Sequence, residues 1–185
     1  MAKRLLDRIL VVDVEATCWD GSAPAGQSND IIEIGVTVFD IASAERTDKR
    51  GVLVRPQRST VSAFCTQLTT LTQEDVDGGV SFAEACALLR DEYRSHERVW
   101  ASWGEYDRQQ FERQCAALGV PYPFGTRHLN VKTLYSLVHA LPHELGMAGA
   151  LAHAGLLLEG THHRGVDDAW NIAGLLGGLL TTGRG

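Results

Sequence analysis

Hydrophobic positions along the chain follow two different periods, and the change from one to the other outlines an α/β fold. Residues 8–14 and 31–40 are β-branched and apolar runs, which is the pattern of buried strands. A shorter run at 50–54 is placed to pair with the second of them as a meander, and 99–102 is a further short strand. A loop rich in Gly, Ser, Pro and Asn at 20–30 separates the first two strands.

Capping residues and helical periodicity predict that most of the remaining chain is helical. Ser81, with Glu84 three residues later, forms a capping box that opens a helix ending near Arg94, and Thr72 is another good N-cap. Gly119 stands where glycine ends helices. The predicted helices after residue 100 are 106–118, 129–140, 147–153 and 166–180.

Three strands followed by helices that alternate with strands predict an α/β domain with a mixed sheet. The length of 185 residues is that of one ordinary domain, and 44% hydrophobic residues suffice for a core. We therefore expect a single domain, residues 1–185, with its core at about 8–181.

Composition and charge argue against several classes of protein. No apolar run approaches the roughly 20 residues needed to cross a bilayer, and no secretory signal is recognisable, so we expect no membrane contact and a cytoplasmic location. Four widely spaced cysteines without a C-x-x-C pair argue against a zinc framework and a disulfide scaffold. The net charge of −6 argues against a broad basic surface for nucleic acid, but it is compatible with acids gathered in a metal site.

Two carboxylates share one face of the first strand. Because side chains alternate along a strand, Ile9, Val11, Asp13 and Glu15 point the same way, and the two acids stand at its C-terminal end. Open α/β sheets bind their ligands at that end. Taken alone, such a pair is equally well explained as a solvated strand end.

Two further acids lie on the apolar faces of predicted helices. Asp107 is followed by Phe111 at i+4, so it belongs to the buried stripe of its helix. Asp168 precedes Ile172 in the same way, whereas Asp167 is rotated from it by about 100°. The helix dipole favours an acid in the first turn, but it does not explain the inward position of Asp107 and Asp168.

Four inward carboxylates in one small domain need a counter-charge, because unpaired buried charges are costly. Hard divalent cations meet that need, and two such ions in one site form the arrangement used for phosphoryl hydrolysis. His163 lies five residues before Asp168, in the loop that enters the last helix, where an imidazole can accept a proton from water near neutral pH. These residues by themselves predict a metal-dependent hydrolytic site.

These acids belong to an ordered set of short motifs. The stretches are Asp13–Trp19 (DVEATCW), Ile32–Gly35 (IEIG), Phe64–Thr69 (FCTQLT), Ser102–Asp107 (SWGEYD) and His163–Ala173 (HRGVDDAWNIA). In this order they resemble the DEDDh exonucleases of the RNase T superfamily, in the branch that contains the 3′ histone-mRNA exonuclease and the bacterial KapD-like proteins. The resemblance covers residues 9–173 and implies a ribonuclease H-like fold, with a central mixed five-stranded sheet flanked by helices.

The resemblance also implies a two-metal site. The ligands of two Mg²⁺ or Mn²⁺ ions would be Asp13, Glu15, Asp107 and Asp168. His163 would be the general base, because the family places four residues between this His and the last Asp, a spacing that excludes His162. Glu33 resembles a structural acid near the site rather than a ligand.

The substrate pocket is implied in the same way. Ala16 and Thr17 match the backbone and the hydroxyl that hold the 3′-terminal sugar. Phe64 and Leu68 match apolar residues that sandwich the terminal base, although core packing alone would explain Phe64 equally well. Trp103, beside the helix of Asp107, is either a packing residue or a further stacking surface for substrate.

The implied function is a metal-dependent 3′→5′ exonuclease that releases nucleoside 5′-monophosphates from the 3′ ends of single-stranded RNA, DNA or both. The alternative is a binding or regulatory module that keeps the exonuclease fold without turnover, although such a module has no reason to keep all five catalytic-type residues. A proofreading subunit of a polymerase, the third hypothesis, predicts a partner-docking segment that the sequence does not show. The resemblance names no protein partner.

Overall fold

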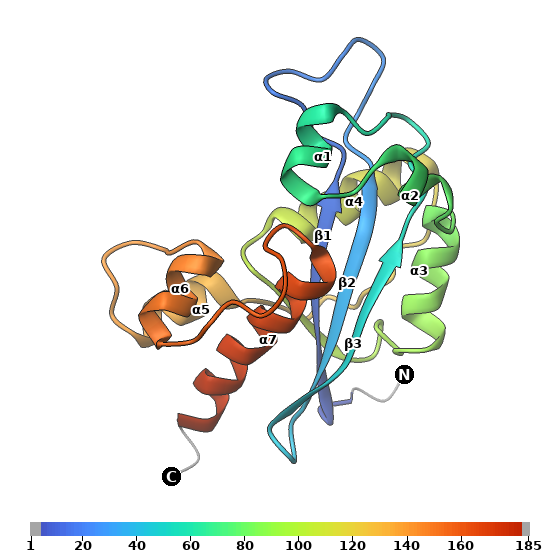
Figure 1. Ribbon diagram of the computed structural model, residues 1–185. Coiled ribbons are helices and arrows are strands. Elements are labelled where there is room, and N and C mark those ends of the chain that lie inside the picture. The colour runs from blue at the N-terminus through green and yellow to red at the C-terminus, as the bar shows by residue number, and fades with distance from the viewer. Residues whose placement is uncertain (1–4, 183–185) are drawn as a thin grey trace.

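The computed structural model of the chain describes residues 5–182, so the two ends of the expected domain, residues 1–4 and 183–185, lie outside the described residues. Within 5–182, five strands and seven helices follow one another (Figure 1). Their order is β1 (Arg8–Ala16), β2 (Ile31–Asp40), β3 (Glu45–Leu53), α1 (Ala63–Thr69), α2 (Gln73–Asp77), α3 (Phe82–Asp91), β4 (Val99–Ser102), α4 (Tyr106–Leu118), β5 (His128–Asn130), α5 (Val131–Val138), α6 (Met147–Ala154) and α7 (Gly165–Thr182).

The strands form one mixed sheet in the order β3-β2-β1-β4-β5, which confirms the expected fold class. β1 pairs antiparallel with β2, and β2 antiparallel with β3, as the predicted meander requires. On the other side of β1, β4 runs parallel to it and β5 runs parallel to β4. Parallel neighbours need crossover connections, which the helices between these strands supply. β1 is therefore the central strand.

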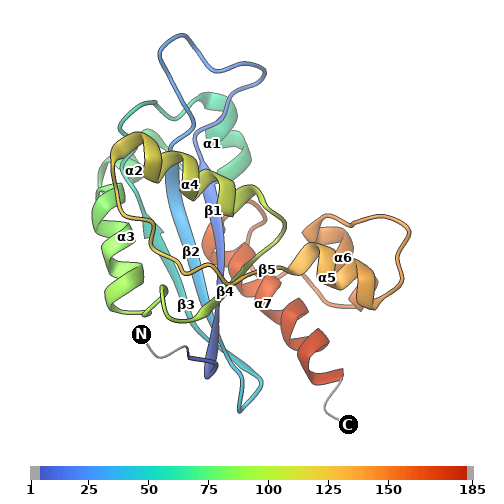
Figure 2. The ribbon, with the colours of Figure 1, turned by 180° about the vertical axis from the view of Figure 1, so that it is seen from behind.

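Helices cover both faces of the sheet (Figures 1 and 2). On one face, Leu10 and Val12 of β1 pack in a core with side chains of α3 and α4. On the other, Ile9 and Val11 pack in a core with side chains of α5, α6 and α7. Because alternate residues of β1 enter different cores, Asp13 falls on the α7 side, as the period of two predicts.

Three predicted elements have different boundaries in the structure. Residues 128–130 are a strand rather than the start of a helix, because they pair with β4, and α5 begins only where the Asn130 side chain caps it and ends at Val138 instead of residue 140. β3 begins at Glu45 rather than at residue 50, because its exposed polar residues give no apolar run. The helix that opens at Ser81 ends at Asp91 instead of near Arg94.

The predicted caps are confirmed, and one helix is additional. Thr72 and Ser81 each form a capping box with the acid three residues later. Gly119 ends α4 in the left-handed conformation at φ 65°. α1 has no counterpart among the predicted helices, since its seven residues are too few for a clear periodic signal; it begins where the Ser62 side chain accepts the backbone N–H of Cys65.

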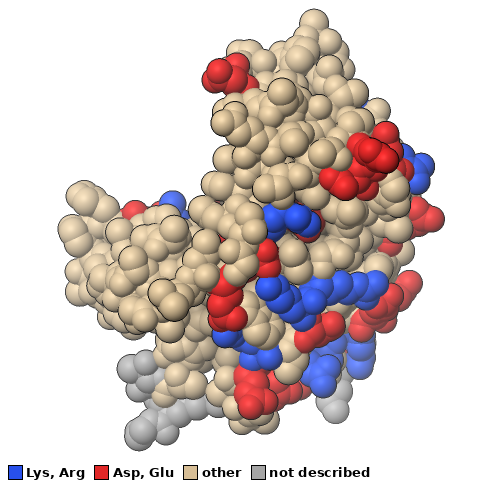
Figure 3. Space-filling model, in the orientation of Figure 1, with Lys and Arg blue, Asp and Glu red and all other residues tan. Residues whose placement is uncertain are grey.

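Charged side chains on the face shown in Figure 3 are mixed rather than sorted by sign. On β3, Lys49 pairs with Asp167 of α7 and Arg50 pairs with Glu92. Local pairing neutralises these cations, so this face of the described residues carries no broad basic surface. Within residues 5–182, no helix combines the length and the hydropathy needed to cross a bilayer.

Candidate active site

The start of α7 lies directly against the sheet because two glycines meet there. A Cβ added to Gly35 of β2 would overlap the backbone carbonyl of Gly165, the first residue of α7. A Cβ added to Gly165 would come within 2.9 Å of the carbonyl oxygen of Asp13. Only residues without a side chain allow this approach, which brings the first turn of α7 onto the C-terminal half of β1.

An internal ion pair holds the same junction. Glu33 of β2 is only 1% exposed, and its carboxylate accepts hydrogen bonds from Arg164 Nε at 3.1 Å and Nη2 at 3.0 Å. The backbone N–H of Gly165 is a third donor, at 2.8 Å. Because its three donors and its counter-charge all come from the segment at the start of α7, the Glu33 carboxylate holds α7 against β2. This agrees with the structural role that the resemblance implies for Glu33.

Three of the four predicted ligand carboxylates meet at this junction. Asp13 and Glu15 from β1 and Asp168 from α7 each offer one oxygen, and these oxygens lie within 4.8 Å of one another. Asp107, from the first turn of α4, lines the same cleft. Its Oδ1 accepts the backbone N–H of Val14 at 2.9 Å, so β1 itself holds this acid in place.

Burial and mutual repulsion oppose ionisation of these acids. Burial, followed by repulsion from Asp107 and Glu15, raises the pKa of Asp13 well above its ordinary value. Burial and then the neighbouring Asp168 raise the pKa of Glu15 to about 8. Burial raises the pKa of Asp107 to about 7, although the bond from Val14 opposes the shift. The four groups therefore share an unfavourable negative charge.

The donor set fits hard divalent cations. Within residues 5–182, none of the ion pairs involves Asp13, Glu15 or Asp107, so the protein itself supplies no direct counter-charge to these three. Clustered carboxylate oxygens are the ligands that Mg²⁺ and Mn²⁺ prefer. These acids could hold such ions, and bound ions would remove the repulsion that raises their pKa values.

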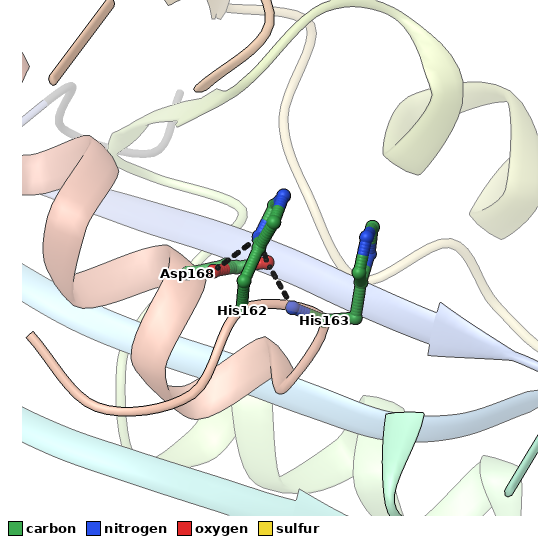
Figure 4. Close-up of side chains that lie close together, drawn as sticks. All are labelled: His162, His163 and Asp168. Atoms are coloured by element: carbon green, nitrogen blue, oxygen red, sulfur yellow. Dashed lines mark hydrogen bonds and ion pairs between the residues drawn. The ribbon is translucent and has the colours of Figure 1, made fainter. Parts of the chain in front are cut away.

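Two adjacent histidines stand beside Asp168 (Figure 4). His162 Nδ1 lies 3.0 and 3.2 Å from the two carboxylate oxygens of Asp168, and the backbone N–H of His163 donates to Oδ2 at 2.9 Å. The two rings are stacked, with centroids 3.9 Å apart. His163 has the left-handed φ of 63°, and its ring forms no hydrogen bond with the described residues. Burial, together with the neighbouring His162, lowers the pKa of His163.

Three predicted substrate residues line the cleft next to the acids. Ala16, Leu68 and Trp103 contribute to the walls of this cavity of about 310 Å³, and His163 lies on the same surface. Trp103 donates its indole N–H to the carbonyl oxygen of Leu145 at 3.2 Å, which fixes the ring at the wall. The structure therefore brings these residues together with all five predicted catalytic residues.

Two other predicted substrate residues do not line the cleft. Thr17 is fully buried; its Oγ1 lies 2.7 Å from Ser59 Oγ and accepts the backbone N–H of Asp30 at 2.9 Å. This hydroxyl therefore connects the end of β1 to the segments that carry Ser59 and Asp30. Its contact with a terminal sugar stays a prediction. Phe64 is 40% exposed on α1 but outside the cleft lining, so its contact with a base also stays a prediction.

The cleft includes residues that sequence reasoning missed. Tyr106, half exposed, precedes Asp107, and Met147 comes from the first turn of α6. Val14, Cys18 and His162 also line the cleft. Tyr106 and His162 are adjacent in sequence to predicted catalytic residues, and this adjacency could have indicated that they belong to the site. No such sequence signal exists for Met147, because only the packing of α6 brings it to the cleft.

The profile of the Exonuclease family, of RNase T type, matches residues 10–176. The chain belongs to this family, that of the DEDDh 3′–5′ exonucleases. This exonuclease is 29% identical to the 3′-5′ exonuclease eri1 of Schizosaccharomyces pombe, over 92% of this chain and 67% of the relative. It is 30% identical to the 3′-5′ exoribonuclease 1 of Rattus norvegicus, over 96% of this chain and 54% of the relative, and so spans about half the length of the rat protein.

Two solved structures show how closely the fold of this exonuclease follows its family. The nuclease domain of 3′hExo, a DEDDh family member bound to rAMP, superposes with a TM-score of 0.88 at 27% identity and covers 98% of this chain and 96% of that one. A 3′-exonuclease described for its 3′-end specific recognition of the histone mRNA stem-loop superposes with a TM-score of 0.84, also at 27% identity, over 96% of this chain and 83% of the other.

Proposed function

We propose that this exonuclease removes nucleoside 5′-monophosphates one at a time from the 3′ ends of single-stranded RNA, DNA or both, with two Mg²⁺ or Mn²⁺ ions. The observation that carries the proposal is the group of inward carboxylates from β1 and α7, of which Asp13 and Glu15 have no ion-pair partner among the described residues, beside Asp107 and the His163 ring, which forms no hydrogen bond with the described residues. The family match and the relative bound to rAMP support it.

The five proposed catalytic residues comprise four metal ligands and one general base. Asp13, Glu15, Asp107 and Asp168 are the oxygen ligands. Two divalent ions held there would polarise the scissile phosphate and stabilise the leaving oxygen. His163 accepts the proton of the attacking water, and its lowered pKa keeps the ring neutral and able to do so near pH 7.

The walls of the cleft would receive the last nucleotide. Leu68, 37% exposed, offers an apolar surface for the base, and Trp103 forms another part of the wall. A cavity of about 310 Å³ is small for a ligand site, which favours one unpaired terminal nucleotide over a base pair. Stacking tolerates every base, so we expect little sequence preference at this position.

Asp107→Asn tests the proposal, because it keeps the size of the side chain but removes a ligand charge. We expect stepwise shortening of 5′-labelled single-stranded RNA or DNA by the wild type in Mg²⁺ or Mn²⁺, none in EDTA, and a loss of at least about 10²-fold in Asp107→Asn. Glu112→Gln, an exposed position on the same helix, is the matched control and should keep wild-type activity. A wild type that binds the strand but shortens no substrate would favour the silent binding module.

A further inference from the structure

Two histidines and an acid at the start of α7 form a second group of possible metal ligands. His162, His163 and Asp168 each offer one ligand atom, and these three atoms lie within 4.8 Å of one another (Figure 4). Of the groups of this kind among residues 5–182, only this one contains nitrogen donors. Asp168 belongs also to the group of Asp13 and Glu15, so the cleft has an all-oxygen side and a nitrogen-rich side that share one carboxylate.

The loop before α7 places both imidazole rings on one side of the backbone. In an extended segment adjacent side chains point in opposite directions, but His163 has a left-handed φ of 63°. With this turn the two rings stack, at a centroid distance of 3.9 Å and an interplanar angle of 20°. The Asp168 carboxylate accepts the backbone N–H of His163 at 2.9 Å, which fixes the acid beside the rings. The single segment 162–168 therefore supplies all three ligands.

The spacing of these ligands fits one tetrahedral ion. Zinc binds imidazole nitrogen and carboxylate oxygen at about 2.0–2.2 Å, so two ligands of the same zinc ion are about 3.3 Å apart. His162 Nδ1 lies 3.0 and 3.2 Å from the two carboxylate oxygens of Asp168. The half-buried His163 ring forms no hydrogen bond with the described residues, so it can leave its stack on His162 and turn about its side-chain bonds to offer the third ligand.

The donor types select a different ion from the one that suits the all-oxygen side. Mg²⁺ prefers oxygen ligands, whereas imidazole nitrogen suits Zn²⁺, which also ranks above Mn²⁺ in the usual order of affinities for mixed nitrogen and oxygen sites. Zinc sites with three protein ligands take water as the fourth. Water can reach this group, because all three residues line the cleft and the His162 side chain is 37% exposed.

We propose that His162, His163 and Asp168 form a Zn²⁺ site, and that zinc bound there inhibits the nuclease. The inhibition rests on the proposed function, since it follows from the roles of His163 as general base and Asp168 as ligand of the catalytic ions. An imidazole that binds zinc through one nitrogen carries a hydrogen on the other, so it has no lone pair with which to accept a proton from water. An Asp168 oxygen bound to zinc is also lost to Mg²⁺.

His162 is the residue that distinguishes this site from the catalytic one, because it has no assigned task in the proposed hydrolysis. His162→Phe keeps an aromatic ring against His163 but removes the ligand nitrogen. The matched control is His139→Phe, which removes a histidine from another close pair, that of His139 and His153, with ring centroids 5.2 Å apart. His139 is exposed and lies outside the cleft lining.

The first measurement is Zn²⁺ binding by calorimetry on the full chain, without substrate and with Mg²⁺ in excess to occupy the all-oxygen side. Loss of a group behind a ligand commonly weakens metal binding 10–100-fold, and loss of a direct ligand should cost no less, so we expect His162→Phe to bind zinc at least about 10-fold more weakly. His139→Phe should stay within about threefold of the wild type. A wild type that binds no zinc, or an unchanged affinity in His162→Phe, would overturn the inference.

The second measurement is the zinc concentration that halves the rate of strand shortening at saturating Mg²⁺, with each variant compared with its own zinc-free rate. This concentration should rise at least about 10-fold in His162→Phe, in step with the binding constant, and should not change in His139→Phe. Equal inhibition of the wild type and His162→Phe would mean that zinc acts on the carboxylates alone, and it would overturn the inference.

The Zn²⁺ site and the proposed function would fail in different ways. Zinc binding that depends on His162, in a wild type that shortens no strand in Mg²⁺, would support the metal site and overturn both the proposed function and the inhibition. Normal shortening in Mg²⁺, with zinc affinity unchanged in His162→Phe, would overturn the site and leave the proposed function intact. If His162→Phe does not fold, His162→Gln decides by the same two measurements: weaker zinc binding supports the site, and unchanged binding overturns it.

Discussion

The buried carboxylates of the cleft oppose folding when no ion is bound. Asp13, Glu15 and Asp107 are ionisable groups that the fold removes from water and places beside one another. Their raised pKa values express this cost, because the folded protein holds protons that the unfolded chain would release. At the scale of single residues, the carboxylates that the proposed function requires therefore lower the stability of the fold, as is common at catalytic sites.

Glu15 makes this cost measurable as a pH dependence. Its pKa rises from 4.5 to about 8 on folding, so the folded chain binds more protons between those values and its stability falls as pH rises through that window. In EDTA, Glu15→Gln should therefore gain stability over the wild type from pH 5 to pH 8, by on the order of 1–3 kcal/mol. Urea unfolding at several pH values measures the difference, with the exposed Glu112→Gln as control. Saturating Mg²⁺ should abolish the gain, and a gain independent of pH would contradict the assignment.

The two adjacent histidines should behave differently in catalysis. His163→Ala should lower the rate about 10²–10⁴-fold, the usual contribution of a general base, and should remove the limb of the pH–rate profile that reports its titration. His162→Ala should cost less, because its Nδ1 faces Asp168 and its spacing differs from that of the family base. Single-turnover rates from pH 5.5 to 9 distinguish the two. A greater loss in His162→Ala would assign the base to the other ring.

At the scale of elements, the site depends on how α7 meets β2. The Gly35–Gly165 contact and the Glu33–Arg164 ion pair fix the first turn of α7 on the sheet, and this turn carries Asp168. Neither contact touches the predicted metal ligands through a side chain. Their effect on the chemistry is exerted through the position of the whole helix.

Gly35→Ala should therefore damage both stability and activity. The added Cβ would overlap the backbone of α7, which cannot rotate away as a side chain can, so we expect a loss on the order of 3 kcal/mol or more. Gly78→Ala is the matched control, because Gly78 has a φ of −75° and its added Cβ would lie 3.5 Å from its nearest neighbour. Chemical denaturation compares the two. A loss below about 1 kcal/mol in Gly35→Ala would show that α7 can shift without penalty.

At the scale of the whole molecule, charge is distributed for local pairing rather than for a wide nucleic-acid surface. The net charge is −6, and most Lys and Arg side chains of residues 5–182 are in ion pairs, among them Arg58 with Asp30 and Arg98 with Asp7. Binding of a strand must then depend on a few contacts at its end and on the ions, and not on many phosphates along its length.

The salt dependence of strand binding tests whether the surface charges are arranged in this way. Each phosphate contact with a single strand contributes about −0.7 to the slope of log K against log salt, so we expect a slope shallower than about −3. Fluorescence anisotropy of Asp107→Asn with a labelled oligonucleotide in EDTA, across a range of KCl concentrations, gives the slope without cleavage. A steeper slope would reveal a basic track that the paired charges of this structure do not supply.

The family and the general fold were predicted correctly from the sequence, and the five residues predicted to be catalytic do line one cleft, because local sequence patterns indicate each of these features. Alternation places Asp13 on the α7 side of β1, and helical periodicity places Asp107 and Asp168 on buried faces. The short strand at residues 128–130 and the length of β3 were not predictable, because partners distant in sequence define edge strands.

What the sequence by itself determined is which acids of β1, α4 and α7 face inward and in which order they come, since the periods of strands and helices act over a few residues. Only the tertiary structure decided that Met147 lines the cleft and that the Thr17 hydroxyl accepts the backbone N–H of Asp30. Met147 and Glu15 line the same cleft although about 130 residues separate them, so such arrangements depend on the packing of whole elements. Local periodicity carries no information about such distances.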